Sequence, residues 1–102
     1  MIEKIRGKHV DNLFRAIKSL NGIEEFYKLF DDLCTISEIN EMSRRLQAAK
    51  LLSDGVVYSE ISEITGLSTA TISRVNRCLK YGSDGYAIVL ERMKNADIFN
   101  EK

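Results

Sequence analysis

The amino-acid sequence predicts an all-α protein, and three observations support this fold class. The 102 residues include no Pro, whereas Leu, Ile, Glu, Lys and Arg are abundant. Apolar residues recur at i, i+3, i+4 and i+7 through most of the chain, which is the spacing of one helix face. Gly residues follow several of these segments, where helices commonly end. The length suits a single domain, 1–102, with a modest core.

Residues 8–33 are predicted to form two helices, 8–20 and 23–33, separated by Asn21-Gly22. Their inner faces are rich in apolar and aromatic side chains: Val10, Leu13, Phe14, Ile17, Leu20, Ile23, Phe26, Tyr27, Leu29, Phe30 and Leu33. These faces could pack on the rest of the same subunit or on a second subunit. We expect a homodimer with 8–33 as its dimerisation helices, because small chains often gain a sufficient core in this way. Residues 1–7 are expected to form a solvated arm.

A long central helix is predicted over residues 35–54. Thr35 or Ser37 is expected to cap it, with Glu38 completing a capping box from Thr35. Its inner face is marked by Ile39, Met42, Leu46 and Ala49 and widened by Ala48, Leu51 and Leu52. The basic residues of this helix, Arg44, Arg45 and Lys50, could contact phosphate, line a ligand pocket or carry solvated charge.

Residues 58–80, YSEISEITGLSTATISRVNRCLK, are predicted to form a helix, a tight turn and a second helix. Ser59 is expected to cap the first helix, whose Ile61 and Ile64 share one face. Gly66 is expected to adopt the left-handed backbone of the turn, and Ser68 to cap the second helix. The inward residues of the second helix are expected to be Ile72, Val75 and Leu79.

The outward face of the second helix has the composition of a DNA-binding surface. At about 100° per residue, this face holds Ala70, Ser73, Arg74 and Arg77, flanked by Thr69, Thr71 and Lys80. Hydroxyls and guanidinium groups bind phosphates and base edges. A face that needed only solubility would favour Glu and Lys, which are better helix formers than Ser and Thr. We therefore expect a DNA-binding helix-turn-helix rather than an ordinary helical hairpin.

The predicted DNA contacts extend from this face to neighbouring residues. They are Ser59, Ser68, Thr69, Ala70, Thr71, Ser73, Arg74, Arg77, Lys80 and Arg44. The chain has a net charge of zero, but residues 43–81 carry six basic and three acidic residues, a local charge of +3. A modestly positive region on a neutral protein suits a binder that does not adhere to every duplex.

The last predicted helix covers residues 83–95. Ser83 is expected to cap it, and Tyr86, Val89, Leu90 and Met93 share its apolar face; beyond it, Ile98 and Phe99 could pack back. Cys34 and Cys78 form no CxxC pattern and are expected to be buried thiols in a reducing compartment, with a disulfide as the alternative. The lone His9 predicts no metal site. No segment has the length of a membrane span or a secretory signal, which favours a cytoplasmic protein.

The run STATISR, followed by Leu79-Lys80, resembles the recognition helix of the Trp repressor family. From about Lys8 to about Lys94, the chain resembles the Trp-repressor-related YerC/YecD proteins. This resemblance implies a six-helix Trp-repressor-like fold and an intertwined dimer. It also implies a transcription regulator, expected to be a repressor, that reads a palindromic operator through the major groove.

The resemblance also implies where an effector pocket would lie. Trp repressors bind tryptophan between two Arg residues that match Arg45 and Arg74, and Thr35 matches a Thr that lines the pocket from the partner subunit. Val75 stands where those repressors have a Gly that leaves room for the indole. We therefore expect a filled site and little or no binding of L-tryptophan. A different small ligand remains an alternative without positive evidence, and no cofactor is expected.

Two other functional classes remain as alternatives. Similar helix-turn-helix modules occur in replication initiators and transposases, but the sequence has no phosphate-binding Gly-rich loop and no acidic triad. The chain could also be a helical dimeric interaction module or a small enzyme without DNA binding. No nucleophile–base pair or metal cluster supports catalysis, so a non-catalytic DNA-binding regulator is the expected function.

Overall fold

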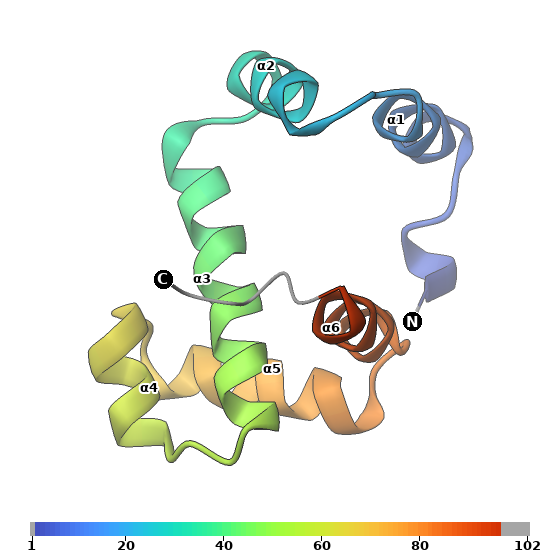
Figure 1. Ribbon diagram of the computed structural model, residues 1–102. Coiled ribbons are helices and arrows are strands. Elements are labelled where there is room, and N and C mark those ends of the chain that lie inside the picture. Colours follow the sequence, from blue (N-terminus) through green and yellow to red (C-terminus); the bar gives the residue numbers. More distant parts are fainter. Residues whose placement is uncertain (1, 97–102) are drawn as a thin grey trace. The chain divides into compact units, whose positions relative to one another are not determined.

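The computed structural model describes residues 2–96, which form six α-helices and a short 3-10 helix, without any strand (Figure 1). The 3-10 helix is η1 (Ile2–Lys4), and the α-helices are α1 (Lys8–Lys18), α2 (Ile23–Leu33), α3 (Ile36–Ser53), α4 (Tyr58–Thr65), α5 (Thr69–Tyr81) and α6 (Gly85–Asn95). The predicted all-α class is therefore confirmed. The suggested packing of Ile98 and Phe99 lies outside the described residues.

The chain divides into two compact units, Met1–Glu41 and Met42–Lys102, and α3 begins in the first and ends in the second. The first unit contains α1 and α2, and none of its described residues is buried. The predicted solvated arm is partly ordered, because η1 and an exposed ion pair between Arg6 and Glu3 lie within it. Helix α1 ends at Lys18, two residues earlier than predicted, where the N–H of Ser19 donates to the carbonyl of Arg15.

The beginning of α3 is held by the predicted capping box. The N–H of Glu38 donates to Oγ1 of Thr35 at 3.1 Å, and the N–H of Thr35 donates to Oε1 of Glu38 at 2.8 Å. These two bonds satisfy donors that a helix start otherwise leaves unpaired. Thr35, and not Ser37, is therefore the capping residue, since Ser37 lies inside the helix.

The second unit holds the core. Ala48 of α3, Ile61 of α4, Leu67 of the following turn and Ile72 of α5 form one buried cluster. Four partly buried residues pack against it: Leu51, Leu52, Val56 and Tyr58. The small Ala side chain at position 48 is fully buried, which allows α3 to approach the helix pair closely. The helix-turn-helix is thus seated on the C-terminal half of α3 (Figure 1).

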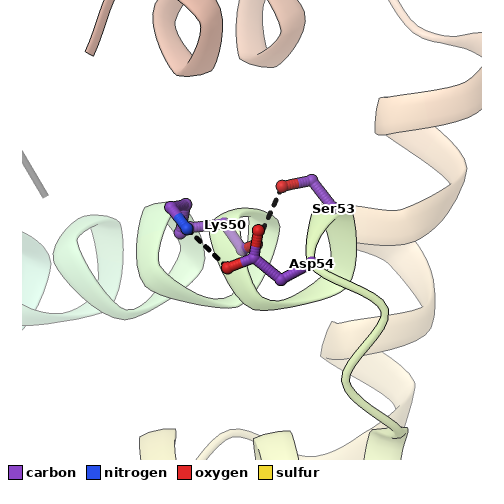
Figure 2. A network of polar contacts seen from close by, with 3 residues as sticks. All are labelled: Lys50, Ser53 and Asp54. Atoms are coloured by element: carbon purple, nitrogen blue, oxygen red, sulfur yellow. Dashed lines mark hydrogen bonds and ion pairs between the residues drawn. The ribbon is translucent and has the colours of Figure 1, made fainter. Parts of the chain in front are cut away.

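The end of α3 is closed by a local polar network (Figure 2). Oγ of Ser53 donates to the carbonyl of Lys50 at 2.8 Å, and the Lys50 ammonium pairs with the carboxylate of Asp54. Gly55 then adopts a left-handed conformation with φ of 85°, and the N–H of Val56 donates to the carbonyl of Leu51. The predicted end of α3 at Asp54-Gly55 is confirmed.

One expectation for α4 is wrong. Ser59 does not cap the helix, because α4 begins at Tyr58, two residues earlier than a cap at Ser59 would allow. Val57 is in the capping position, and its carbonyl accepts a hydrogen bond from the N–H of Ile61. Ile61 is fully buried, but Ile64 is 50% exposed. The inner face of this two-turn helix runs from Ile61 to Thr65, at i and i+4, and Ile64 lies beside it.

The start of α6 also differs from the prediction. The chain turns at Asp84, which has a left-handed φ of 70°, and the helix begins at Gly85 without a side-chain cap from Ser83. Both cysteines are free thiols, as expected, but neither is buried: Cys34 is half-buried and Cys78 is exposed. On the predicted inner faces of α3 and α6, Met42 and Val89 are likewise exposed.

Candidate nucleic-acid interface

The turn between α4 and α5 is fixed by its own side chains. Gly66 has a φ of 78°, as predicted, and its N–H donates to the carbonyl of Ser62 at 2.8 Å. Oγ of Ser62 donates to the carbonyl of Leu67 at 2.7 Å, and the N–H of Leu67 donates to Oγ1 of Thr65. Because Leu67 is also buried in the core, the turn holds α5 at a defined angle to α4.

The N-terminus of α5 carries the predicted cap. Oγ of Ser68 accepts a hydrogen bond from the N–H of Thr71 at 3.1 Å and donates to Oγ1 of Thr71 at 3.1 Å. Ser68 has an extended backbone, as capping residues commonly do. The exposed residues Ser68, Thr69 and Ala70 therefore lie at the positive end of the helix dipole, which attracts phosphate.

Helix α5 has a buried side and an exposed cationic side. Ile72 and Val75 are buried and Leu79 is half-buried, so the predicted inward positions are confirmed. On the other side, the exposed residues are Thr69, Ala70, Arg74, Arg77 and Lys80, and Ser73 is half-buried. Within the second unit, the fold thus presents a face with small side chains, hydroxyls and three cations along one helix.

The remaining predicted contacts lie elsewhere. Ser59 on α4 and Arg44 on α3 are exposed, so both are accessible to a ligand. Thr71 is half-buried and engaged with Ser68. Its predicted contact with base edges stays a prediction.

A small pocket of about 90 Å³ lies beside this face, within the second unit. It is lined by Arg45 of α3, by Thr71, Arg74, Val75 and Cys78 of α5, and by Tyr86 of α6. The fold therefore brings Arg45, Arg74 and Val75 together, as expected from the resemblance. Val75 is only 3% exposed, which agrees with its interpretation as a filled core position. Thr35 belongs to the first unit, where it caps α3.

Tyr86 is the pocket residue that sequence reasoning missed. Its burial raises the pKa of the phenol, the nearby Cys78 thiol adds to this increase, and the guanidinium groups of Arg45 and Arg74 oppose it. The sequence places Tyr86 on the apolar face of α6, but only the packing of α6 against α5 shows that it reaches the two Arg residues.

Neither a metal centre nor a membrane span is found in the part of the chain that the structure describes. Within residues 2–96, no three His, Cys, Asp or Glu side chains gather in a way that could hold a metal ion. None of the described helices combines the length and apolar character needed to cross a bilayer.

Comparison with known proteins identifies the family. The family described as Trp repressor protein matches residues 8–94. The uncharacterized protein YerC of Bacillus subtilis is 52% identical over 96 residues, which cover 94% of this chain and 92% of YerC.

Two solved structures have the same fold. A proposed Trp repressor from Staphylococcus aureus superimposes with a TM-score of 0.87 at 51% identity, over 92% of this chain and 94% of that one. A TrpR-like protein from Eubacterium eligens gives a TM-score of 0.86 at 50% identity, over 90% and 95% of the two chains. With a family match over most of its length and close relatives in sequence and structure, this chain belongs to the Trp repressor family, in the branch that includes YerC.

Proposed function

We propose that this protein is a sequence-specific DNA-binding transcription regulator of the cytoplasm, acting as a homodimeric repressor without catalytic activity. Helix α5 would enter the major groove with its N-terminal turn, so that Ala70, Ser73 and Arg77 approach base edges. Ser68, Thr69 and Lys80 would contact the flanking phosphates, with Ser59 and Arg44 as further backbone contacts.

The observation that carries this proposal is the exposed face of α5 on a rigid support. The face holds three cations and several hydroxyls, which is the chemistry of phosphate and base recognition. The buried side of the same helix and the hydrogen-bonded turn before it fix the direction of the face. Recognition surfaces on rigid elements bind with less loss of conformational entropy.

The homodimer is supported by the apolar side chains of the first unit. Large exposed residues there include Leu13, Phe14, Ile23, Phe26, Tyr27 and Leu33. Apolar surface of this extent on a small chain is a common sign of a protein interface. A second copy of the chain would bury it and would present two α5 helices to the two halves of a palindromic operator.

We further propose that L-tryptophan is not a corepressor of this protein. The pocket of about 90 Å³ is smaller than the cavity of about 150 Å³ that accepts benzene in an engineered protein, and an indole is larger than benzene. Isothermal titration calorimetry tests this point directly. Micromolar binding of L-tryptophan would show that the pocket opens.

The DNA-binding proposal is tested by fluorescence anisotropy with labelled fragments of the source genome at several salt concentrations. We expect tight binding to a few fragments, with log K falling linearly in log salt by about 0.9 per phosphate contacted. Uniform weak binding to all fragments would argue against sequence specificity. Absence of binding at low salt would contradict the proposal.

The groove face is tested by Arg77→Ala and Ser73→Ala on α5. Each should weaken binding to the preferred fragment by about 1–3 kcal/mol and relax the sequence preference. Arg92→Ala is the matched control for charge, because Arg92 is exposed on α6 and its loss changes the net charge by the same unit as Arg77→Ala. Equal effects of the two Arg substitutions would mean that α5 is not the recognition helix.

A further inference from the structure

The pocket beside α5 joins three helices, and α6 contributes Tyr86 to its lining. The other lining residues come from α3, through Arg45, and from α5, which supplies Thr71, Arg74, Val75 and Cys78. The α5 residues are spaced at i, i+3, i+4 and i+7, so they form one stripe along the helix. This stripe lies between the buried side of α5 and its outward face. A group that fills the pocket therefore touches the side of the recognition helix.

Tyr86 lies in this pocket between groups from both other helices. Its phenol is partly buried and lies within electrostatic range of Arg45 on α3 and of Arg74 and Cys78 on α5. Tyr combines an apolar ring with a polar tip, which suits a lining that includes both the apolar Val75 and the guanidinium groups of Arg45 and Arg74. The ring thus links α6 to both α3 and α5.

The short connection from α5 to α6 keeps Tyr86 in this position. The N–H of Gly82 donates to the carbonyl of Cys78 at 2.9 Å. A Cβ at position 82 would overlap with that carbonyl oxygen, so Gly is required here. Asp84 then takes a left-handed conformation, and α6 starts at Gly85. Tyr86 is the second residue of α6, so this turn places it beside the part of α5 that carries Cys78.

Little space remains beside this ring. The free volume of about 90 Å³ is smaller than the cavity of about 150 Å³ that accepts benzene in an engineered protein. Val75 and Tyr86 therefore narrow, from within the chain, the space between Arg45 of α3 and Arg74 of α5.

We propose that Tyr86 is an internal aromatic spacer that holds α5 against α3 in its DNA-binding orientation, so that this protein binds its operator without a small-molecule effector. This inference rests on the proposed DNA-binding function and concerns how that DNA binding is regulated. Tyr86 is a positioning residue, because it acts on DNA through the placement of α5 and Arg74 and does not touch DNA itself.

The test compares Tyr86→Ala with Tyr86→Phe in the anisotropy assay described above. If removal of the ring leaves each α5 in the competent orientation for only about a third of the time, both helices of the dimer are competent for about a tenth of the time, and operator affinity falls about tenfold. Tyr86→Phe retains the ring and should keep most of the affinity. Ile88→Ala is the matched control, since Ile88 is an exposed side chain of the same helix, 46% accessible, and does not line the pocket.

Chemical rescue separates positioning from general stability. p-Cresol is the Tyr side chain as a free molecule, so it can enter the space that the Tyr86→Ala substitution vacates. Millimolar p-cresol should restore the operator affinity of Tyr86→Ala and leave the wild type and Ile88→Ala unchanged. Calorimetry without DNA should show p-cresol binding to Tyr86→Ala and not to the wild type. If the Ala variant does not fold, Tyr86→Leu, which keeps part of the apolar volume, replaces it in both assays.

Each outcome is informative. Wild-type affinity in Tyr86→Ala would overturn the proposal, as would a weakened variant that p-cresol neither binds nor restores. If the wild type binds no DNA at all, the proposed function fails, and the orienting role of Tyr86 fails with it. The calorimetric result still reports separately whether the Tyr86 ring fills space that a free phenol can enter.

Discussion

The two units of this chain differ in what they bury. All seven buried residues among positions 2–96 belong to the second unit: Ala48, Ala49, Ile61, Thr65, Leu67, Ile72 and Val75. The first unit has helices with equally clear apolar faces, yet Phe14 and Tyr27 are 54% and 67% exposed. Amphipathic spacing therefore predicts the helices of both units. In neither unit does it show which other surface covers the apolar face of a helix.

The largest effect is expected in the core of the second unit. Ile61→Ala removes a fully buried side chain from the cluster beneath the helix-turn-helix, which should lower the free energy of unfolding by about 2–5 kcal/mol. Ile64→Ala, on the exposed side of the same helix, should change it by less than about 0.5 kcal/mol. Urea denaturation followed by circular dichroism measures both. Similar losses would mean that α4 is not seated on α3 by Ile61.

The apolar face of the first unit should control association instead. Phe14→Glu places a charge on that face, and we expect self-association to weaken by at least about tenfold, or about 1.4 kcal/mol. Val57→Glu changes an exposed apolar residue of the second unit and should leave association intact. Sedimentation equilibrium measures the self-association of both variants. Unchanged self-association of the Phe14→Glu variant would contradict the proposed role of α1 in dimerisation.

Glycines with positive φ occur in both units, in two different backbone regions. Gly66 is left-handed, with φ of 78° and ψ of 3°, so replacement by Ala should cost about 1–2 kcal/mol. Gly22 has φ of 80° and ψ of 160°, a region that is essentially restricted to Gly, so replacement by Ala should cost about 1–3 kcal/mol. Gly85→Ala, at the start of α6 with open space around its Cα, should cause no loss. Thermal unfolding would show the difference. A much larger effect at Gly66 would indicate that its turn also supports the core.

Helix caps should contribute about equally in the two units. Thr35→Ala and Ser68→Ala each remove a hydroxyl that accepts a backbone N–H, at an expected cost of about 0.5–2 kcal/mol. Ser37→Ala and Ser59→Ala serve as controls, because both residues lie inside their helices and should have little effect. Chemical denaturation of the four variants tests whether the sequence-based capping rule holds for this protein.

The smallest effect should come from the titration of Tyr86. Its pKa is raised above the ordinary value of 10.0 by burial and by Cys78, against the opposing effect of Arg45 and Arg74. Folding therefore favours the neutral phenol, and this contribution to stability is complete below pH 10 and is lost as the pH rises through the folded-state pKa. Thermal unfolding from pH 8 to 11 should decline less in Tyr86→Phe than in the wild type. Identical curves would contradict the burial of this phenol.

Local sequence signals determined most of the secondary structure. The left-handed Gly66, the cap at Ser68 and the capping box of Thr35 and Glu38 are short-range arrangements, so residue type and spacing were sufficient to predict them. The same holds for the inward stripe of α5. The predictions for Ser59 and Ser83 failed because a Ser near a helix start has no effect if the backbone turns at a neighbouring residue, here Val57 and Asp84.

Only the tertiary structure decided which side chains share a pocket and which apolar residues are covered. Tyr86 meets Arg45 and Arg74 from a different helix, and no spacing in the sequence encodes the angle between α5 and α6. Ile61 and Ile64 are equally apolar, yet the position of α3 buries one and leaves the other exposed. Periodicity gives each helix its apolar side, whereas burial depends on which neighbouring element reaches that side.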